Sequence, residues 1–188
     1  MKKGFFVKHR TVSAVKRVEF ISDGMSFTVL RGCLHNIIIL NVRAPNEEKC
    51  NYKDRFYEEM GQTFNHFPKY HTKILLRDFN AKLGRDNIFK PTNENDSLHQ
   101  DSNNNGVRIL IRATSKKFIN STKFPHQNIH KFTWIAPNGK TNNHNDHILI
   151  DRRLLLSTLN VWSLWEADCD THHYLVVAKV RERLAVIK

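Results

Sequence analysis

The segment Lys73–Leu83, with the sequence KILLRDFNAKL, decides the fold and supplies the first candidate site residues. Its apolar run predicts a buried strand, and Asp78 and Asn80 come where that strand should end. Side chains two apart in an extended chain project to the same face, so we expect these two to point together. A carboxylate that takes a proton from water, beside an amide that orients a phosphate, suits phosphoester hydrolysis. The same pair is also typical of a turn with Asx hydrogen bonds.

Several strands are expected before this segment. The apolar blocks and the turn residues between them predict strands at Gly4–Val7, Val15–Ile21, Met25–Leu30 and Leu34–Val42. The run IIILNV within the last of these is apolar on both faces, which favours a sheet covered on both sides, as in a layered α/β protein. Because the chain opens in an expected strand, we also expect a domain truncated at its N-terminus.

Two amphipathic helices are expected. Tyr52–Phe67 carries apolar residues at spacings of three and four and is followed by Pro68. Asn105 is expected to cap a second helix, with a stripe formed by Val107, Leu110, Ile111, Thr114 and Phe118. Between the two helices, Pro91–Asn105 has almost no apolar content and reads as a long polar loop, the most mobile segment predicted.

The last third of the chain is expected to be strands. Phe132–Ile135 and His147–Ile150 are predicted strands, and Pro137–Lys140 between them carries the Asn-Gly signal of a hairpin turn. Antiparallel pairing of these two strands is therefore expected. Val161–Trp165 and Tyr174–Val180 are the final predicted strands.

Length and charge indicate one domain with a polyanionic partner. The chain has 188 residues, which suits a single domain spanning 1–188. It carries 30 Lys and Arg against 18 Asp and Glu, a net charge of +12. Such an excess favours a polyanion such as nucleic acid as the partner, and a generally basic solvated surface is the alternative.

Cysteine usage and the N-terminal sequence bear on the compartment. The three cysteines are odd in number and lack CxxC spacing, so neither a disulfide framework nor a zinc site is indicated. The apolar run near the start is broken at Lys8–Arg10, too early for a signal peptide or a membrane span. We therefore expect an intracellular protein without membrane contact, with the nucleus among its possible locations.

Polar clusters stand directly against apolar strands at three places. They are Asp78/Asn80 after ILL, Asn145/Asp146 before HILI, and Asp170/His172/His173 before YLVV. Active-site groups collect at the edges of sheets, because the sheet fixes their positions while the loops leave them accessible to solvent. Taken singly, Asp146 also suits a surface turn, and the histidines suit a solvated loop.

Five segments in this order and spacing carry a family resemblance. They are NVRAPN, LLRDFNAKLGR, FTW, NDHILID and THHYLVVAKV. Together they resemble the endonuclease/exonuclease/phosphatase superfamily, and within it the endonuclease domain of LINE-type retrotransposons and craniofacial development protein 2-like sequences. The resemblance implies a four-layer α/β sandwich of the DNase I-like type. It also implies Mg²⁺-dependent hydrolysis of phosphodiesters in one step.

The resemblance assigns roles to individual residues. Asp78 matches the Asp that activates water or handles the leaving group, and Asn80 matches the Asn that orients nucleophile and phosphate. Asp146 matches the Asp that orients the final His, and His173 matches that His, which contacts the scissile phosphate. Arg43, in NVRAPN, stands where the family usually has Tyr or His and is expected to contact phosphate together with Asn80 and His173.

Departures from the family pattern all concern the metal and its surroundings. The Gln-Glu motif whose Glu binds the metal has no counterpart here, and His172 stands in place of a metal-associated Asp. Arg77 replaces the Gly before Asp-x-Asn. Imidazole is a poor substitute for the oxygen ligands of Mg²⁺, so no metal ligand is assigned with assurance, and Asp170 is a weak candidate.

Two lost carboxylates predict little or no turnover, since metal charge supplies several kcal/mol of transition-state stabilisation. The function expected is thus a retroelement-derived domain that has lost catalysis and at most binds nucleic acid. An active Mg²⁺-dependent DNA endonuclease is the alternative. An inositol-phosphate or lipid phosphatase of the same fold lacks any specific motif in the sequence.

Overall fold

The computed structural model places two α-helices and ten strands among the residues it describes, which are 4–45, 50–85, 92, 97, 99–124, 131–164 and 172–186. In chain order the elements are η1 (His9–Ala14), β1 (Val15–Ser22), β2 (Met25–Leu30), β3 (Ile37–Val42), α1 (Cys50–His66), β4 (Thr72–Asp78), α2 (Asn104–Ser115), β5 (Phe118–Asn120), η3 (Ser121–Lys123), β6 (Trp134–Ile135), β7 (Asn142–Asn143), β8 (Asp146–Asp151), η5 (Arg152–Leu154), β9 (Thr158–Leu164) and β10 (Leu175–Val180).

The main sheet has six strands in the order β1-β2-β3-β4-β8-β5. The first three strands form an antiparallel meander, and β4 lies parallel to β3 because α1 carries the chain back across the sheet. Strand β8 then lies antiparallel between β4 and β5. Register shifts at Val15/Arg17 and at Phe20/Ser22 interrupt the pairing of β1, which lies at one edge of the sheet.

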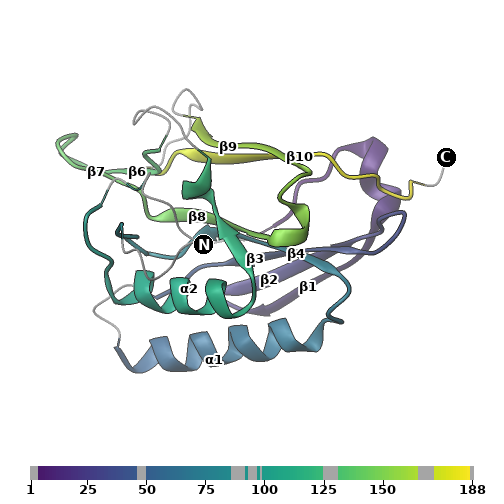
Figure 1. Cartoon of the computed structure of the whole chain (residues 1–188), viewed down its shortest axis with the longest axis horizontal. Coiled ribbons are helices and arrows are strands. Elements are labelled where there is room, and N and C mark those ends of the chain that lie inside the picture. The colour runs from purple at the N-terminus through teal and green to yellow at the C-terminus, as the bar shows by residue number, and fades with distance from the viewer. Residues whose placement is uncertain are drawn as a thin grey trace.

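Each face of this sheet is covered, as the apolar character of IIILNV on both sides predicts. Figure 1 shows α1 and α2 on one face and the β9–β10 pair on the other. Met25, Leu40 and Leu75 point into the core beneath the helices, whereas Ile74 and Ile148 belong to a second core that faces β9–β10. The described residues thus form three layers, and the fourth layer of the expected sandwich stays a prediction.

Helix α1 confirms the first amphipathic pattern. Phe56, Met60 and Phe67 are buried, and Phe64 packs against the same core. The helix ends at His66, just before Phe67 and Pro68. Among the described residues, no helix is both long and apolar enough to span a membrane.

Helix α2 differs from the prediction at its start and on its buried face. Asn103, rather than Asn105, is the N-cap, and its side chain accepts a hydrogen bond from the Gly106 N–H at 2.8 Å. The buried face consists of Asn105, Gly106, Ile109, Leu110 and Ala113, so the predicted stripe through Val107 and Ile111 is wrong. Both of these side chains are exposed, because the stripe that packs on the core is offset by one residue, about 100° around the helix axis, from the predicted one.

Other expectations need correction. Gly4–Val7 forms no strand, and β3 begins at Ile37 rather than at Leu34. The Asn-Gly turn exists, but it joins β6 to the short β7, whereas β8 pairs with β4 and β5. The predicted turn is therefore confirmed, and the predicted pairing of the strand before it with β8 is wrong. Turn residues determine the conformation of the loop but not which strand pairs beyond it.

The described parts of the Asn-rich loop are held by hydrogen bonds. Thr92 and Ser97 are buried, and the Thr92 carbonyl accepts from the Asn120 N–H at 3.0 Å. Residues 91, 93–96 and 98 of this loop lie outside the described residues.

Candidate active site

Three of the predicted site residues meet at one end of the main sheet. Asp78 is the last residue of β4 and lies opposite Asp146, the first residue of β8, in the antiparallel register. His173 comes from the segment that leads into β10. One ligand atom from each of the three residues lies within 4.8 Å of the others. The Nδ1 atom of His173 is 3.0 Å from Oδ2 of Asp146, a distance that indicates a hydrogen bond.

Thr133 holds both members of this Asp–His pair. Its side-chain Oγ1 accepts hydrogen bonds from the N–H groups of Asn145, at 2.9 Å, and Asp146, at 3.0 Å. Its carbonyl accepts from the Tyr174 N–H at 2.9 Å, next to His173 in the chain. Thr133 is almost fully buried, so one side chain and its own backbone fix the separation of the two site segments.

Asn80 does not continue the strand. It adopts a left-handed backbone conformation with φ of 47°, and its N–H donates to Oδ1 of Asp78 at 2.9 Å. Its side-chain amide donates to the Ala44 carbonyl at 2.8 Å. The expectation that Asp78 and Asn80 share one face of an extended strand is therefore wrong. The Asx hydrogen bond of the alternative interpretation is the one that forms.

Burial and mutual repulsion act on the two carboxylates. Burial raises the pKa of Asp78 above its ordinary value, and the charge of Asp146 raises it further, while the Asn80 N–H, His173 and Arg43 oppose the rise. The hydrogen bond to Asp146 raises the pKa of His173, although burial acts against it. The site therefore favours a protonated imidazole beside its carboxylates.

Comparison with known proteins begins with sequence. No protein-family model matches the chain. It is 28% identical over 186 residues to craniofacial development protein 2 of Bos taurus, and 28% identical over 185 residues to that of Tragulus javanicus. Each match covers 96% of this chain but only 31% and 32% of the relative. The chain thus spans about a third of the length of these relatives.

Solved structures resemble the chain over most of its length. The endonuclease domain of TRAS1, a telomere-specific non-LTR retrotransposon, matches with a TM-score of 0.61 at 11% identity, covering 85% of this chain and 64% of that one. An endonuclease/exonuclease/phosphatase family protein from Leptotrichia buccalis matches with a TM-score of 0.55 at 14% identity, covering 84% and 52%. The chain has the endonuclease/exonuclease/phosphatase fold.

A 3′ phosphatase from Neisseria, solved with a product DNA hairpin, shares this fold with a TM-score of 0.61 at 16% identity, over 90% of this chain and 72% of that one. The resemblance deduced from the sequence motifs is therefore confirmed at the level of the fold.

The other predicted site residues lie beside the three-residue cluster, away from it, or outside the described residues. Arg43 is exposed, and its charge acts on both Asp78 and His173, so it lies beside the site. His172 lies outside the three-residue cluster; its side chain is exposed, and its carbonyl accepts from the Ile135 N–H at 2.9 Å. Asp170 and the side chain of Arg77 lie outside what the structure describes.

The donor set of the cluster suits a divalent cation. Two carboxylates that approach each other in a partly buried place repel, and a cation relieves that repulsion. Carboxylate oxygens are ligands that Mg²⁺ and Mn²⁺ prefer, and imidazole is more often found with transition metals. Asp78, Asp146 and His173 can therefore hold such an ion in an endonuclease/exonuclease/phosphatase fold.

Sequence reasoning missed Thr133 and a group of buried histidines. Thr133 lies inside FTW, a motif that carries the family resemblance but does not indicate that the Thr133 hydroxyl accepts hydrogen bonds in the site. His147 is buried, its Nε2 is 2.8 Å from the Ala81 carbonyl oxygen, and its ring lies 4.3 Å from that of buried His144. Burial lowers the pKa of His147 to about 4 and that of His144 well below its ordinary value.

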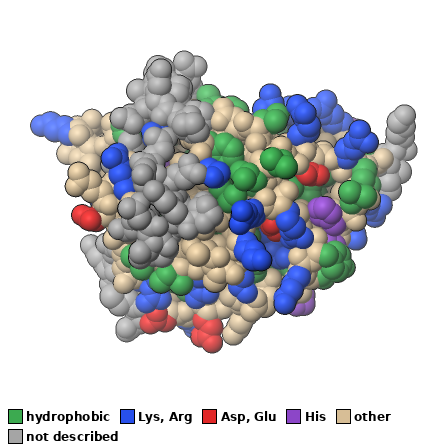
Figure 2. All heavy atoms as spheres, viewed as in Figure 1, with side chains coloured by type: hydrophobic (Ala, Val, Ile, Leu, Met, Phe, Trp, Pro, Cys, Tyr) green, Lys and Arg blue, Asp and Glu red, His purple; other side chains and the backbone are tan. Residues whose placement is uncertain are grey.

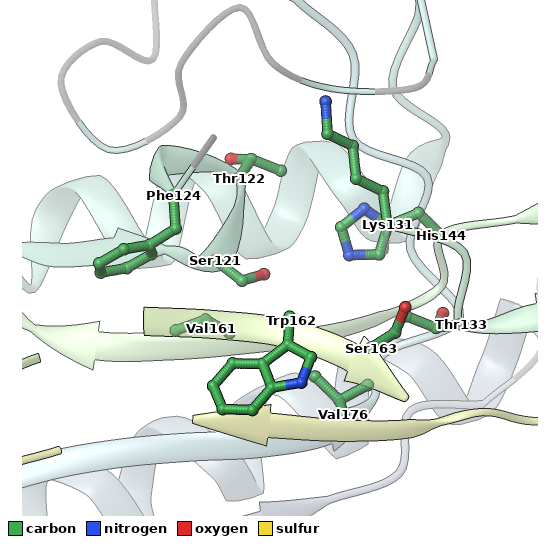
Figure 3. A pocket seen from close by; sticks show the side chains of 10 residues that line it. All are labelled: Ser121, Thr122, Phe124, Lys131, Thr133, His144, Val161, Trp162, Ser163 and Val176. Carbon is green, nitrogen blue, oxygen red and sulfur yellow. The ribbon is translucent and has the colours of Figure 1, made fainter. Parts of the chain in front are cut away.

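A small cavity lies behind Thr133, between η3 and the β9–β10 pair (Figure 3). Its volume is about 20 Å³, which is room for one water molecule. His144 Nδ1 and Ser163 Oγ, both in residues that line it, are buried and have no hydrogen-bond partner among the described residues. Polar groups of this kind suit one bound water, and the cavity is too small for a substrate.

Proposed function

We propose that the protein is a nucleic-acid-binding domain of nuclease type, spanning 1–188, that binds a phosphodiester at Asp78, Asp146 and His173 and hydrolyses it weakly or not at all. One observation carries the proposal: these three side chains, from three separate segments, converge within 4.8 Å on an endonuclease/exonuclease/phosphatase fold. DNA is the partner proposed, in agreement with the net charge of +12 and with the DNA-bound 3′ phosphatase of the same fold. Such a role would place the protein with nuclear DNA.

The proton-handling half of the site is complete. Asp146 accepts from Nδ1 of His173, which fixes the orientation of the ring and leaves Nε2 to donate to a phosphate oxygen. Asp78, whose pKa is raised by burial, is a candidate to accept or deliver a proton during cleavage. Asn80 holds the Ala44 carbonyl and the Asp78 carboxylate, so we assign it a positioning role as well as the phosphate contact that the resemblance implies.

The metal-binding half is weaker. Asp78 and Asp146 would hold the cation, Mg²⁺ by family resemblance, which would supply positive charge to the phosphate oxygens. His172 adds no carboxylate to this set, and the protonated form of His173 that its raised pKa favours repels a cation. Weak metal binding is therefore the physical reason for expecting slow hydrolysis.

The test is a nicking and binding experiment on the purified chain. Supercoiled plasmid is incubated with Mg²⁺ or Mn²⁺, and binding of a labelled DNA duplex is followed by fluorescence anisotropy. The proposal predicts binding in the presence of the cation, with nicking no faster than that of Asp78→Ala. Failure to bind DNA with the cation present would overturn it.

An active Mg²⁺-dependent endonuclease is the second candidate, and the same three-residue cluster favours it. It predicts nicking clearly above Asp78→Ala. His172→Asp separates the two further, because it adds a carboxylate beside His173, and His172→Asn is the matched control without charge. If the first proposal holds, only His172→Asp nicks plasmid faster than the unchanged chain. If the chain is an active endonuclease, neither variant nicks plasmid faster than the unchanged chain.

A further inference from the structure

The end of the main sheet opposite the active site is strongly basic. Because β4 and β8 are antiparallel, Asp78 and Asp146 lie at one end of the pair, and Thr72 and Asp151 lie toward the other. Seven residues of extended chain put these ends about 20 Å apart. Exposed cations surround the second end, and we call them the basic end: Lys16, Arg31, Arg152, Arg153, Arg181 and Arg183.

Backbone contacts join the segments that carry these cations. The Arg31 N–H donates to the carbonyl of Ala14, the last residue of η1, at 2.7 Å, and the Arg31 carbonyl accepts from the Ala185 N–H at 2.8 Å. The Arg183 carbonyl accepts from the Cys33 N–H at 3.0 Å. Segments far apart in sequence are thus fixed side by side, so the charges stay close together despite their repulsion.

Arg153 joins the remaining segments and is itself anchored. Its guanidinium donates to the carbonyls of Tyr70, at 2.9 Å, and His71, at 2.7 Å, and to the Asp151 carboxylate. The ring of His71 in turn contacts Asn36 in the turn that follows Arg31.

The local field at this end is positive. Burial lowers the pKa of His71, and the charges of Lys73, Lys16, His35 and Arg153 lower it further. The acidic residues near these cations are Asp151, which Arg153 already engages, and Glu182, while Glu19, further along β1, pairs with Arg17. Figure 2 shows blue side chains with a purple histidine among them gathered over the right half of the face, where η1 and the C-terminal segment lie in Figure 1.

We propose that the basic end is a second nucleic-acid-binding surface, which binds the phosphate backbone independently of the active site. Five of its six cations are arginines, whose planar guanidinium matches phosphate oxygens in a fork. Tyr70, 65% exposed beside Arg153, offers an aromatic face on which an unpaired base can stack.

The two surfaces lie about 20 Å apart at opposite ends of the strands, so a phosphate group bound at one end does not touch the other. The two surfaces can therefore bind separate phosphates, of one strand or of two.

A membrane surface is the competing occupant. Leu34 and Leu156 are 94% and 96% exposed on turns at this end, and aliphatic tips among cations also suit an anionic bilayer. Nucleic acid is favoured because the cations are mainly arginines and the nearby exposed ring is aromatic. The experiment includes both partners.

Binding is measured in EDTA with a labelled 20-nucleotide single strand and the matching duplex. Without a cation, the carboxylates of the active site repel phosphate, so binding under these conditions reports on the basic end. We expect Arg152→Ala/Arg181→Ala/Arg183→Ala to bind at least about tenfold more weakly and to reduce the salt slope for the duplex by about 2 to 3. Arg55→Ala/Lys82→Ala/Lys140→Ala removes three exposed cations elsewhere and should lose less than about threefold.

Further variants test whether nucleic acid binds at the basic end. Asp78→Ala should not weaken binding in EDTA, because it removes a carboxylate that repels phosphate, and this separates the basic end from the proposed active site. Arg152→Lys/Arg181→Lys/Arg183→Lys keeps the charge and should keep most of the salt slope, which excludes unfolding as the cause of the loss. Equal losses in the two alanine triples, or no binding in EDTA, would overturn the proposal. So would binding to phosphatidylserine vesicles, lost in Leu34→Ser/Leu156→Ser, without any binding to DNA.

Discussion

The two ends of the main sheet are built in opposite ways from the same strands. At the Asp78 end, the polar side chains are partly or fully buried, and Thr133 and Asn80 connect them by short hydrogen bonds. At the basic end, the charged groups stand exposed on turns, and backbone contacts hold the turns rather than the charges. Arg153 is the exception, since its guanidinium is itself bonded.

This difference shows that the two ends need different degrees of geometric precision in their side chains. Chemistry at a phosphate requires groups fixed to a fraction of an ångström, which burial and hydrogen bonding supply at a cost in charge repulsion. Holding a polyanion requires charge density and tolerates side-chain motion. Substitutions at the first end should therefore change stability much more than substitutions at the second.

The largest effect expected is the acid sensitivity caused by His147. Its folded-state pKa is lowered from 6.5 to about 4, so the unfolded chain binds more protons between these values. Stability is therefore lost as pH falls from about 6.5 to about 4, by about 3 kcal/mol from this residue. His147→Gln should flatten the pH dependence of the urea-unfolding free energy in this range.

His173→Gln is the matched control with the opposite sign. The raised pKa of His173 gives stability that is complete below its unfolded pKa and is lost as pH rises through its folded pKa. Removing it should abolish the gain in stability that accompanies a fall in pH through this folded pKa, and should leave the loss between about pH 6.5 and 4 as steep as in the unchanged chain. Parallel pH profiles for the two variants would contradict the assignment of either shift.

Thr133→Val should cost about 2 kcal/mol, because it leaves the N–H groups of Asn145 and Asp146 without their acceptor. Urea unfolding measures the loss, and thermal shifts with Mn²⁺ should show a smaller stabilisation by the metal than in the unchanged chain. Thr141→Val, at an exposed threonine, is the control and should stay within about 0.5 kcal/mol. A Thr133→Val protein as stable as this control would show that Thr133 does not hold the pair.

Asn80→Ala and Asn80→Gly together test the left-handed turn. Both remove the bond to the Ala44 carbonyl, but only alanine is strained at φ of 47°, so it should be about 1 kcal/mol less stable than the glycine variant. Equal unfolding free energies would indicate that the turn relaxes when the asparagine is lost.

The smallest effects are expected at the basic end. Arg153→Ala should cost below about 1 kcal/mol, since its bonds are partly exposed to solvent. Arg152→Ala, its neighbour, should change the unfolding free energy by less than about 0.5 kcal/mol. A large loss in Arg152→Ala would break the contrast between the two ends.

Much of this architecture follows from local sequence. Strands β2 and β4 and helix α1 appear close to where periodicity predicts them, because each buries a regular apolar pattern. Asp78, Asp146 and His173 also meet as the motifs imply. Their grouping depends on strand order, which periodicity alone does not provide.

The failures have a common cause in contacts distant along the chain. Asn80 leaves the strand because its amide reaches the Ala44 carbonyl, 36 positions earlier. The cap of α2 falls on Asn103, whose side-chain amide also donates to the Asn80 carbonyl at 3.0 Å. The role of Thr133 could not be predicted, because the sequence does not distinguish a buried hydroxyl from an exposed one.

The interrupted pairing of β1 bears on self-association. An outermost strand offers its free backbone groups as a template to another chain, and exposed Val18 and Phe20 would add apolar contact. The two register shifts bend this strand, and Arg17 places a charge along it. An incoming ladder could therefore match only a few consecutive residues, which guards the protein against polymerising through this side even at high concentration.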